Sequence, residues 1–231
     1  MVSSQTDRIW CPGAILHSVC TCVYEPLGLP RPSTKYRFTL LRFGELTMIV
    51  LGEFFIKLAI SSAGRELTAV NYLIGIGLLA ISVSLWLLYF DHPEHVDLSL
   101  ASTRLWAWTY NHFPFVMGIT VYGVVGNKSF AAAPGQPLGD TKRMLFTSAL
   151  AVAVLSFRFI EWATKEKDEP LSRKPQPLIR LLSAVVLLVL GVVSDALNVG
   201  WLVAIVFSIF LAQVGLDFYA RLLLPVPVIQ E

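Results

Sequence analysis

Long apolar segments follow one another from Leu41 onward, and short polar stretches separate them. The apolar residues do not alternate with polar ones as they do in strands, and several segments are long enough for membrane helices. Breakers such as Asp91-His92-Pro93 interrupt the apolar runs. We therefore predict an all-α, polytopic transmembrane helix bundle of six spanning helices. The predicted helices are Leu41–Ser62, Asn71–Phe90, Arg104–Val125, Arg143–Trp162, Leu178–Ser194 and Trp201–Leu224.

Composition supports a membrane protein, because only 15% of the residues are charged. Soluble domains average about 25% charged residues. Three windows without any charge, Thr68–Phe90, Leu105–Asn127 and Ala196–Leu216, each exceed the roughly 18 apolar residues that mark a transmembrane candidate. The lipid bilayer is therefore the first expected partner. The net charge of +2 gives no indication of nucleic acid binding.

The amino-terminal part has a weaker pattern than the rest. We divide the chain into residues 1–40, a poorly structured or interfacial segment, and residues 41–231, the transmembrane helical domain. Whether residues 9–24 enter the membrane stays open, because Pro12 and His17 interrupt that apolar stretch. The three cysteines all precede the first predicted helix, without His or Asp at ligand spacing, so we expect neither a metal site nor a cofactor.

A carboxylate and an ammonium lie within the apolar stretch Leu41–Ser62. In a membrane helix each of Glu53 and Lys57 costs roughly 2.5–3.5 kcal/mol, and such residues usually face a protein interior and serve a function. Their spacing of four residues places both on one helix face. The alternative is a self-neutralising pair that only packs the bundle.

Further ionisable and amide side chains are expected at comparable depths. Asn111 and His112 precede Pro114, which removes a backbone donor and kinks a helix. His112 either belongs to a binding or gating point or only bonds across the bundle. Arg158 and Glu161 are expected to pair with each other, as are Asp217 and Arg221. The predicted intramembrane polar site comprises Glu45, Glu53, Lys57, Asn111, His112 and Arg158.

Three segments resemble motifs of the bacterial low temperature requirement A family. RFGELTMIVLGE (Arg42–Glu53) resembles the family signature E-R-F-G-L-x-T-I-I-x-L-G-E. LWLLYFD (Leu85–Asp91) resembles W-W-L-Y-F-D, and YNHFPFVMGI (Tyr110–Ile119) resembles Y-x-H-x-P-x-x-x-G-I. The resemblance runs from about Arg37 to the end of the chain. It implies a multi-pass protein of the bacterial inner membrane whose molecular activity is not established.

The resemblance also implies which residues occupy family positions. These residues are Arg42, Glu45, Glu53, Asp91, His112 and Pro114. The chain departs from the signature at Leu41, where the family has an acid, and at Glu45, where the family usually has an apolar residue. Family members are generally longer, so we expect a shortened member that matches their carboxyl-terminal part.

Two function classes fit these features. The first is transport or sensing of a small solute or ion through a buried Glu/Lys/His site. The second is a non-transporting scaffold or regulator whose polar residues are structural. No P-loop, GxSxG, HExxH or CxxC motif occurs, and we expect no enzyme.

The sequence allows two alternatives for the oligomeric state. Either the chain forms a homo-oligomer through its first helix, or the later helices enclose the face of that helix that bears Glu53. We favour enclosure, because Asn111 and His112 offer partners within the chain.

The orientation in the membrane is a testable prediction. Twelve Lys and Arg residues flank the helices on one side and four on the other, which places both termini in the cytoplasm. A reporter fused after Glu231 should be active as a cytoplasmic fusion, and one inserted beside Gly135 as a periplasmic fusion. A label on Cys11 reports whether residues 9–24 add a seventh span.

Overall fold

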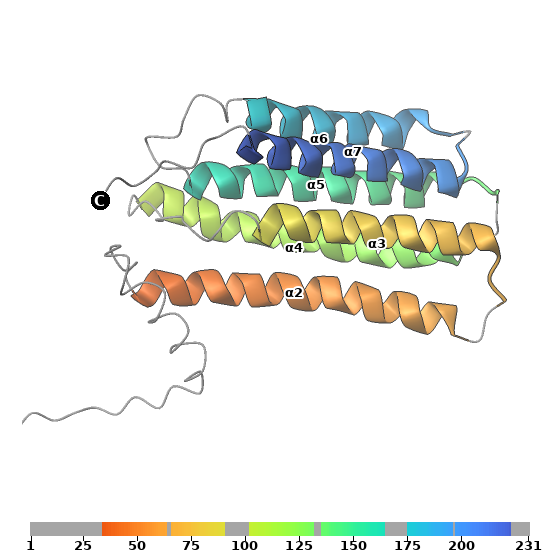
Figure 1. Ribbon diagram of the computed structural model, residues 1–231, viewed down its shortest axis with the longest axis horizontal. Helices are drawn as coiled ribbons and strands as arrows, with labels where there is room; N and C mark the ends of the chain where they lie inside the picture. The colour runs from red at the N-terminus through yellow and green to blue at the C-terminus, as the bar shows by residue number, and fades with distance from the viewer. Residues whose placement is uncertain are drawn as a thin grey trace, which may run out of the picture. The chain divides into compact units, whose positions relative to one another are not determined.

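A computed structural model describes residues 34–63, 66–90, 102–131, 135–164, 175–195 and 197–222. The chain divides into two units, residues 1–39 and 40–231, and all packing described below lies within the second. Six helices follow one another along the described residues (Figure 1). They are α2 (Thr34–Ser62), α3 (Ala69–Phe90), α4 (Ser102–Phe130), α5 (Asp140–Thr164), α6 (Pro175–Val193) and α7 (Val199–Leu222).

The fold class predicted from the sequence is confirmed. The described residues contain six helices and no strand, apart from one isolated bridge between Pro137 and Asn198 in two connections. By length and composition, three of the described helices can cross a membrane, with mean hydropathies of 2.2, 1.6 and 2.2. These stretches are Ala69–Phe90, Asp140–Ala163 and Val199–Tyr219, and the apolar stretch Pro177–Val193 is shorter. Six spanning helices therefore remain a prediction.

Two helices are longer than the apolar pattern predicted, while the other boundaries agree within three residues. α2 begins at Thr34 rather than Leu41, so residues 34–40, which we assigned to the poorly structured or interfacial segment, are helical. α4 continues to Phe130 rather than Val125. In its last turn Ser129 and Phe130 are buried, and the hydroxyl of Ser129 donates to the carbonyl of Val125 at 2.8 Å. The predicted amino-terminal segment otherwise lies outside the described residues.

The helices run alternately in opposite directions. Short connections join α2 to α3, α4 to α5 and α6 to α7 at one end of the bundle, which we call the hairpin end (right in Figure 1). α2, α4 and α6 begin at the opposite end, and α3, α5 and α7 finish there. We call this the terminal end.

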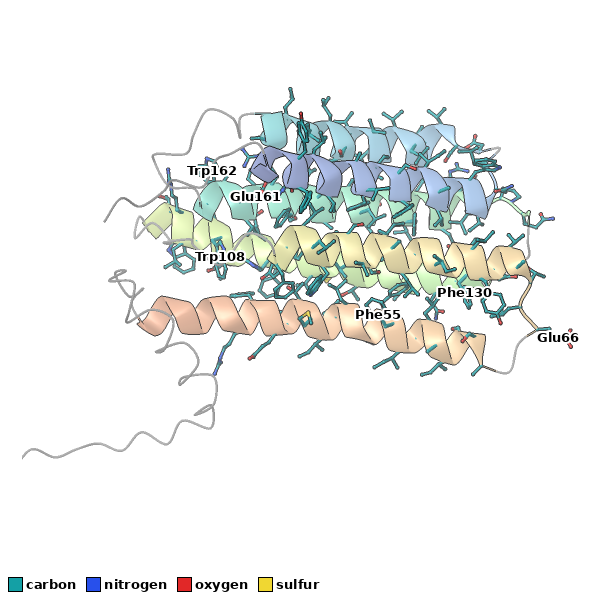
Figure 2. The ribbon with its side chains drawn as sticks, in the orientation of Figure 1. Phe55, Glu66, Trp108, Phe130, Glu161 and Trp162 are labelled. Carbon is teal, nitrogen blue, oxygen red and sulfur yellow. The ribbon has the colours of Figure 1, made fainter. Side chains whose placement is uncertain are left out.

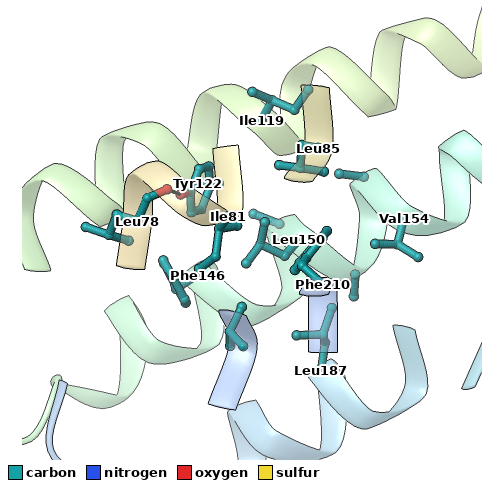
Figure 3. Close-up of a cluster of buried hydrophobic side chains, with 14 of the residues drawn as sticks. Leu78, Ile81, Leu85, Ile119, Tyr122, Phe146, Leu150, Val154, Leu187 and Phe210 are labelled. Carbon is teal, nitrogen blue, oxygen red and sulfur yellow. Dashed lines mark hydrogen bonds between the residues drawn. The ribbon is translucent and has the colours of Figure 1, made fainter. Parts of the chain in front are cut away.

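Helix α5 lies between α4 and α6, and α7 packs on α3. The closest approach is between α4 and α5, where a Cβ added to Gly118 would lie 2.6 Å from the carbonyl oxygen of Ala149. Apolar side chains from α3, α4, α5, α6 and α7 meet in one buried cluster (Figure 3). Within it the Tyr122 hydroxyl of α4 donates to the Leu78 carbonyl of α3 at 2.6 Å.

Helix α2 joins this core along a narrow stripe. Its buried side chains are Thr47, Leu51, Phe54 and Leu58, which recur at the helical spacing of four, three and four residues. The remaining faces of α2 carry large exposed apolar side chains, including Ile49, Ile56 and Ile60. One stripe of α2 therefore packs on the bundle, and the rest of its surface is available to lipid or to another protein.

The close contact of α4 with α5 predicts opposite effects for two glycine substitutions. Gly118→Ala should lower the free energy of unfolding by about 1–3 kcal/mol, because the new Cβ overlaps the backbone of α5. Gly215→Ala in α7 is the control, since nothing lies within 4 Å of its Cβ position. The control should gain up to about 1 kcal/mol from helix propensity. Unfolding in detergent micelles, followed by circular dichroism, measures both. Equal stability of the two variants would contradict this packing.

Candidate functional site

The first candidate from the sequence, Glu53 with Lys57, forms an ion pair on α2. Lys57 Nζ lies 2.7 Å from Glu53 Oε1. The side chains are 45% exposed for Lys57 and 56% exposed for Glu53. The expectation that this pair faces the interior of the bundle is therefore wrong, and so is the expectation that later helices enclose it. The physical reason is the position of the buried stripe, which uses the face through Phe54 and leaves the pair on its flank.

A small depression between α2 and α4 adjoins the pair. It is lined by Glu53, Lys57, Val50 and Phe54 of α2 and by Ile119, Thr120, Gly123 and Val124 of α4. Its volume of about 20 Å³ is enough for roughly one water molecule. Within one chain, this depression is too small for a solute.

Two other members of the predicted site lie apart from this pair. Glu45 is exposed on α2, eight residues before Glu53. Asn111 is half-buried on α4, and its Nδ2 donates to the carbonyl of Ala107 on its own helix at 2.7 Å. Among the described residues, neither side chain contacts Glu53 or Lys57. Asp91, which the family motif singled out, lies outside the described residues.

His112 links α4 to α3. Its Nδ1 lies 2.7 Å from the carbonyl oxygen of Trp108, and its Nε2 lies 3.1 Å from the hydroxyl of Tyr89. A carbonyl can only accept, so Nδ1 carries the proton and the Tyr89 hydroxyl donates to Nε2. The ring is buried against Phe43 and Trp108, with centroids 4.5 Å and 4.2 Å away. Both nitrogens are satisfied, which favours the structural alternative for this histidine.

A buried ionic cluster joins α5, α6 and α7 near the terminal end. Arg180 Nη2 donates to Asp217 Oδ2 at 2.8 Å, and Arg180 Nη1 pairs with Glu161 Oε2. The side chain of Arg180 is 2% exposed, that of Glu161 4% and that of Asp217 11%. The guanidinium also lies 4.4 Å from the ring centre of Phe157. We call Arg180, Glu161 and Asp217 the Arg180 triad; Figure 2 labels Glu161 near the end of α5.

Sequence reasoning missed this triad. It expected Glu161 to pair with Arg158, three residues before it, but in the structure Glu161 pairs with Arg180 of another helix. Arg180 was counted only as a basic residue that flanks the membrane. The available signal was its place five residues inside α6, between apolar neighbours. The expected partner of Asp217, Arg221, has a side chain outside the described residues.

Two polar side chains without partners adjoin the Arg180 triad. Gln213 lies one turn before Asp217 on α7 and is buried, and neither atom of its amide has a hydrogen-bond partner in the described part of the chain. The same holds for Nη1 of Arg158, which is also buried.

The register of α5 against α6 places Arg158 near Arg180. A Cβ on Gly191 would overlap the hydroxyl of Thr147, so these two residues face each other. Arg158 lies eleven residues after Thr147 on α5, and Arg180 lies eleven residues before Gly191 on the antiparallel α6. Eleven residues make about three helical turns. Both arginines therefore occupy facing surfaces at the same level.

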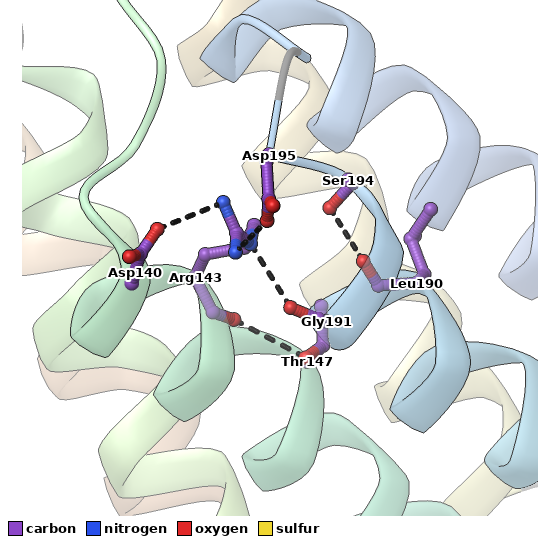
Figure 4. Close-up of polar contacts among 7 residues, drawn as sticks. All are labelled: Asp140, Arg143, Thr147, Leu190, Gly191, Ser194 and Asp195. Atoms are coloured by element: carbon purple, nitrogen blue, oxygen red, sulfur yellow. Dashed lines mark hydrogen bonds and ion pairs between the residues drawn. The ribbon is translucent and has the colours of Figure 1, made fainter.

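A second arginine cluster lies at the hairpin end (Figure 4). Arg143 Nε donates to the carbonyl of Gly191 at 2.9 Å, and its Nη1 lies 3.2 Å from Asp140 Oδ1. Its Nη2 pairs with Asp195. In contrast to the Arg180 triad, these carboxylates are open to solvent, with Asp140 87% and Asp195 75% exposed. This cluster fastens the start of α5 to the end of α6.

In the described residues, no group of three or more His, Cys, Asp or Glu side chains could hold a metal ion.

The polar groups that share one buried region are the Arg180 triad, Gln213 and Arg158. Of these, only Arg158 belongs to the site predicted from the sequence.

Comparison with known proteins gives one family. The family model described as bacterial low temperature requirement A protein (LtrA) matches residues 37–213, well over half of the chain. This range contains Glu161, Arg180 and Gln213 and ends four residues before Asp217. No match was found among curated proteins, and none among solved structures.

The difference in exposure between the two arginine clusters predicts different costs of removing each arginine. Arg180→Leu should lower the free energy of unfolding by about 3–5 kcal/mol, because it removes the buried cation that two buried carboxylates share. Arg143→Leu should cost less, since water can solvate Asp140 and Asp195. Denaturation in mixed micelles measures both values. If Arg143→Leu costs as much as Arg180→Leu, burial does not control the energetics of these clusters.

Proposed function

The chain belongs to the bacterial low temperature requirement A family of membrane proteins, and from this premise we propose that it moves a small solute or ion across the membrane, linked to protons. It acts in the inner membrane, with both termini in the cytoplasm, and it catalyses no covalent chemistry. The polar region around the Arg180 triad takes part in the movement.

One observation carries this proposal. Arg180 is 2% exposed and is held by carboxylates from two other helices, Glu161 of α5 and Asp217 of α7. Ionisable residues at membrane depth are expensive, and they commonly mark ion pathways and proton relays. A purely structural contact among α5, α6 and α7 could use leucine at all three positions.

The neighbours of the Arg180 triad support a ligand-binding role. Gln213 presents an unpartnered amide, and Arg158 presents an unpartnered N–H. Buried polar groups without partners cost free energy that a polar ligand or water would recover. Under the predicted orientation, the terminal end faces the cytoplasm, so this region lies within reach of cytoplasmic solutes.

The arrangement of the triad suggests how movement could be coupled. Glu161 belongs to α5, Asp217 to α7, and both bind the single guanidinium of α6. A proton that neutralises one carboxylate, or an anionic solute that takes its place at the guanidinium, weakens the contact of one helix with α6 while the other ion pair remains. Two such states, each biased by the ligand, are what alternating access requires.

The alternative function is a membrane scaffold or regulator that transports nothing. The observation that favours it is the exposed Glu53–Lys57 pair, which lies where another membrane protein could bind. Proton flux through the purified protein distinguishes the two functions.

The proposal predicts proton flux that depends on Asp217. Liposomes that contain the protein and the pH dye pyranine should acidify faster than empty liposomes when valinomycin and a potassium gradient impose a membrane potential. Asp217→Asn should slow this flux at least about tenfold, which a barrier increase of about 1.4 kcal/mol is enough to cause. Asp195→Asn is the matched control, because it removes the same charge from an exposed cluster at the hairpin end.

Two results would contradict the proposal in different ways. Wild-type flux equal to that of empty liposomes would favour the scaffold. Wild-type flux that is unaffected by Asp217→Asn would retain transport and place its site elsewhere.

A further inference from the structure

On the outer face of α2, one charged pair lies among exposed apolar side chains. Ile49, Ile56 and Ile60 are 67%, 61% and 67% exposed, as expected of side chains that face lipid. Glu53 lies in the same stripe, with Lys57 directly beside it. Both charged side chains are about half exposed, and the depression beside them is lined by apolar residues apart from Thr120, whose hydroxyl donates to the carbonyl of Val116 on its own helix.

The depth of this pair makes exposure to lipid costly. Glu53 lies nine residues before the end of α2 at Ser62, about 13 Å at 1.5 Å per residue. The hydrocarbon core is about 30 Å thick, so Glu53 lies near its middle if α2 crosses the membrane. Lys57 does not extend toward the nearer interface but turns back to Glu53 at 2.7 Å. The pair therefore stays at depth, where lipid can satisfy none of its remaining hydrogen-bonding capacity.

The stripe has the spacing of a helix-pairing seam. Ile49, Glu53, Ile56 and Ile60 are separated by four, three and four residues, which is the a/d repeat of a two-stranded coiled coil. In this repeat Glu53 occupies an a position and Lys57 the adjacent e position. Gly52 is at the flanking g position, where nothing lies within 4 Å of a Cβ, so a second helix could approach closely.

We propose that this stripe is the interface of a homodimer, in which Lys57 of a second copy completes the coordination of Glu53. The occupant is a second copy because the surface is complementary to itself in charge. A parallel pair of α2 helices brings two carboxylates and two ammoniums together at the same level, and each carboxylate gains a second cation. The four charges sum to zero and lie between layers of isoleucine. A single polar layer of this kind fixes the register of two helices.

Disulfide crosslinking tests the interface in the full-length chain. Cys11, Cys20 and Cys22 are first replaced by Ser, and single cysteines are then introduced in α2. Ile49→Cys, Ile56→Cys and Ile60→Cys should give crosslinked dimers in native membranes. Phe55→Cys is the matched control, because Phe55 is also exposed and adjacent in depth but faces α3 beside Val83 and Trp86. The control should give no dimer.

Charge exchange tests the role of the ion pair independently of the seam. Glu53→Lys places four ammoniums together and Lys57→Glu places four carboxylates together. Each should reduce crosslinking through Ile56→Cys at least about tenfold, since like charges in contact cost several kcal/mol. The double variant Glu53→Lys/Lys57→Glu should restore it. Co-expression of the two single variants should give heterodimers, which also shows that both chains fold and insert.

Three outcomes would overturn the proposal. Crosslinks at Phe55→Cys as strong as those at Ile56→Cys would mean random collision. Capture of Ile56→Cys by a different protein would identify another occupant. Dimers that survive each single charge reversal would show that Glu53 and Lys57 do not form the interface. None of these outcomes depends on whether the protein moves protons.

Discussion

A hydrocarbon bilayer supplies no water to a charged side chain, and this constraint explains the polar contacts of the bundle. Arg180 lies between Glu161 and Asp217 and over the ring of Phe157. His112 has both nitrogens bonded. Arg143, at the hairpin end, also has anionic partners, but its carboxylates, Asp140 and Asp195, are exposed to solvent. The carboxylates that bind Arg180 are buried, whereas those that bind Arg143 are exposed and can use solvent as well.

The packing of α5 decides which residues can meet. Gly118 allows α4 to lie against the backbone of α5, and Gly191 of α6 leaves room for the side chain of Thr147 of α5. These close contacts set the register that brings α6 opposite the last turns of α5. The Arg180 triad is a consequence of that register, because a shift by one residue would rotate Arg180 by about 100° away from Glu161. Stability and the proposed function therefore depend on the same small residues.

Helix α2 differs from the other helices in how it satisfies its charges. Its stripe through Leu51 and Phe54 is buried, but among the described residues the ionic partner of Glu53 is Lys57 alone. A charged pair that is half exposed beside an apolar stripe is an incomplete interaction, and a second copy is the simplest partner that matches it. The buried triad and the exposed pair would then have separate roles, one in ligand movement and the other in assembly.

The sequence by itself determined the helical class, the order of the six helices, most of their boundaries and the family, because apolar runs and short motifs are local properties. It also gave the Glu53–Lys57 contact, which the spacing of four residues within one helix sets. Only the tertiary structure decided that this pair faces outward, that His112 bonds Tyr89, and that Glu161 pairs with Arg180 instead of Arg158. Those outcomes depend on the rotation of each helix about its axis and on the register between helices. Both are set by close packing between residues far apart in the chain, and no local pattern encodes them.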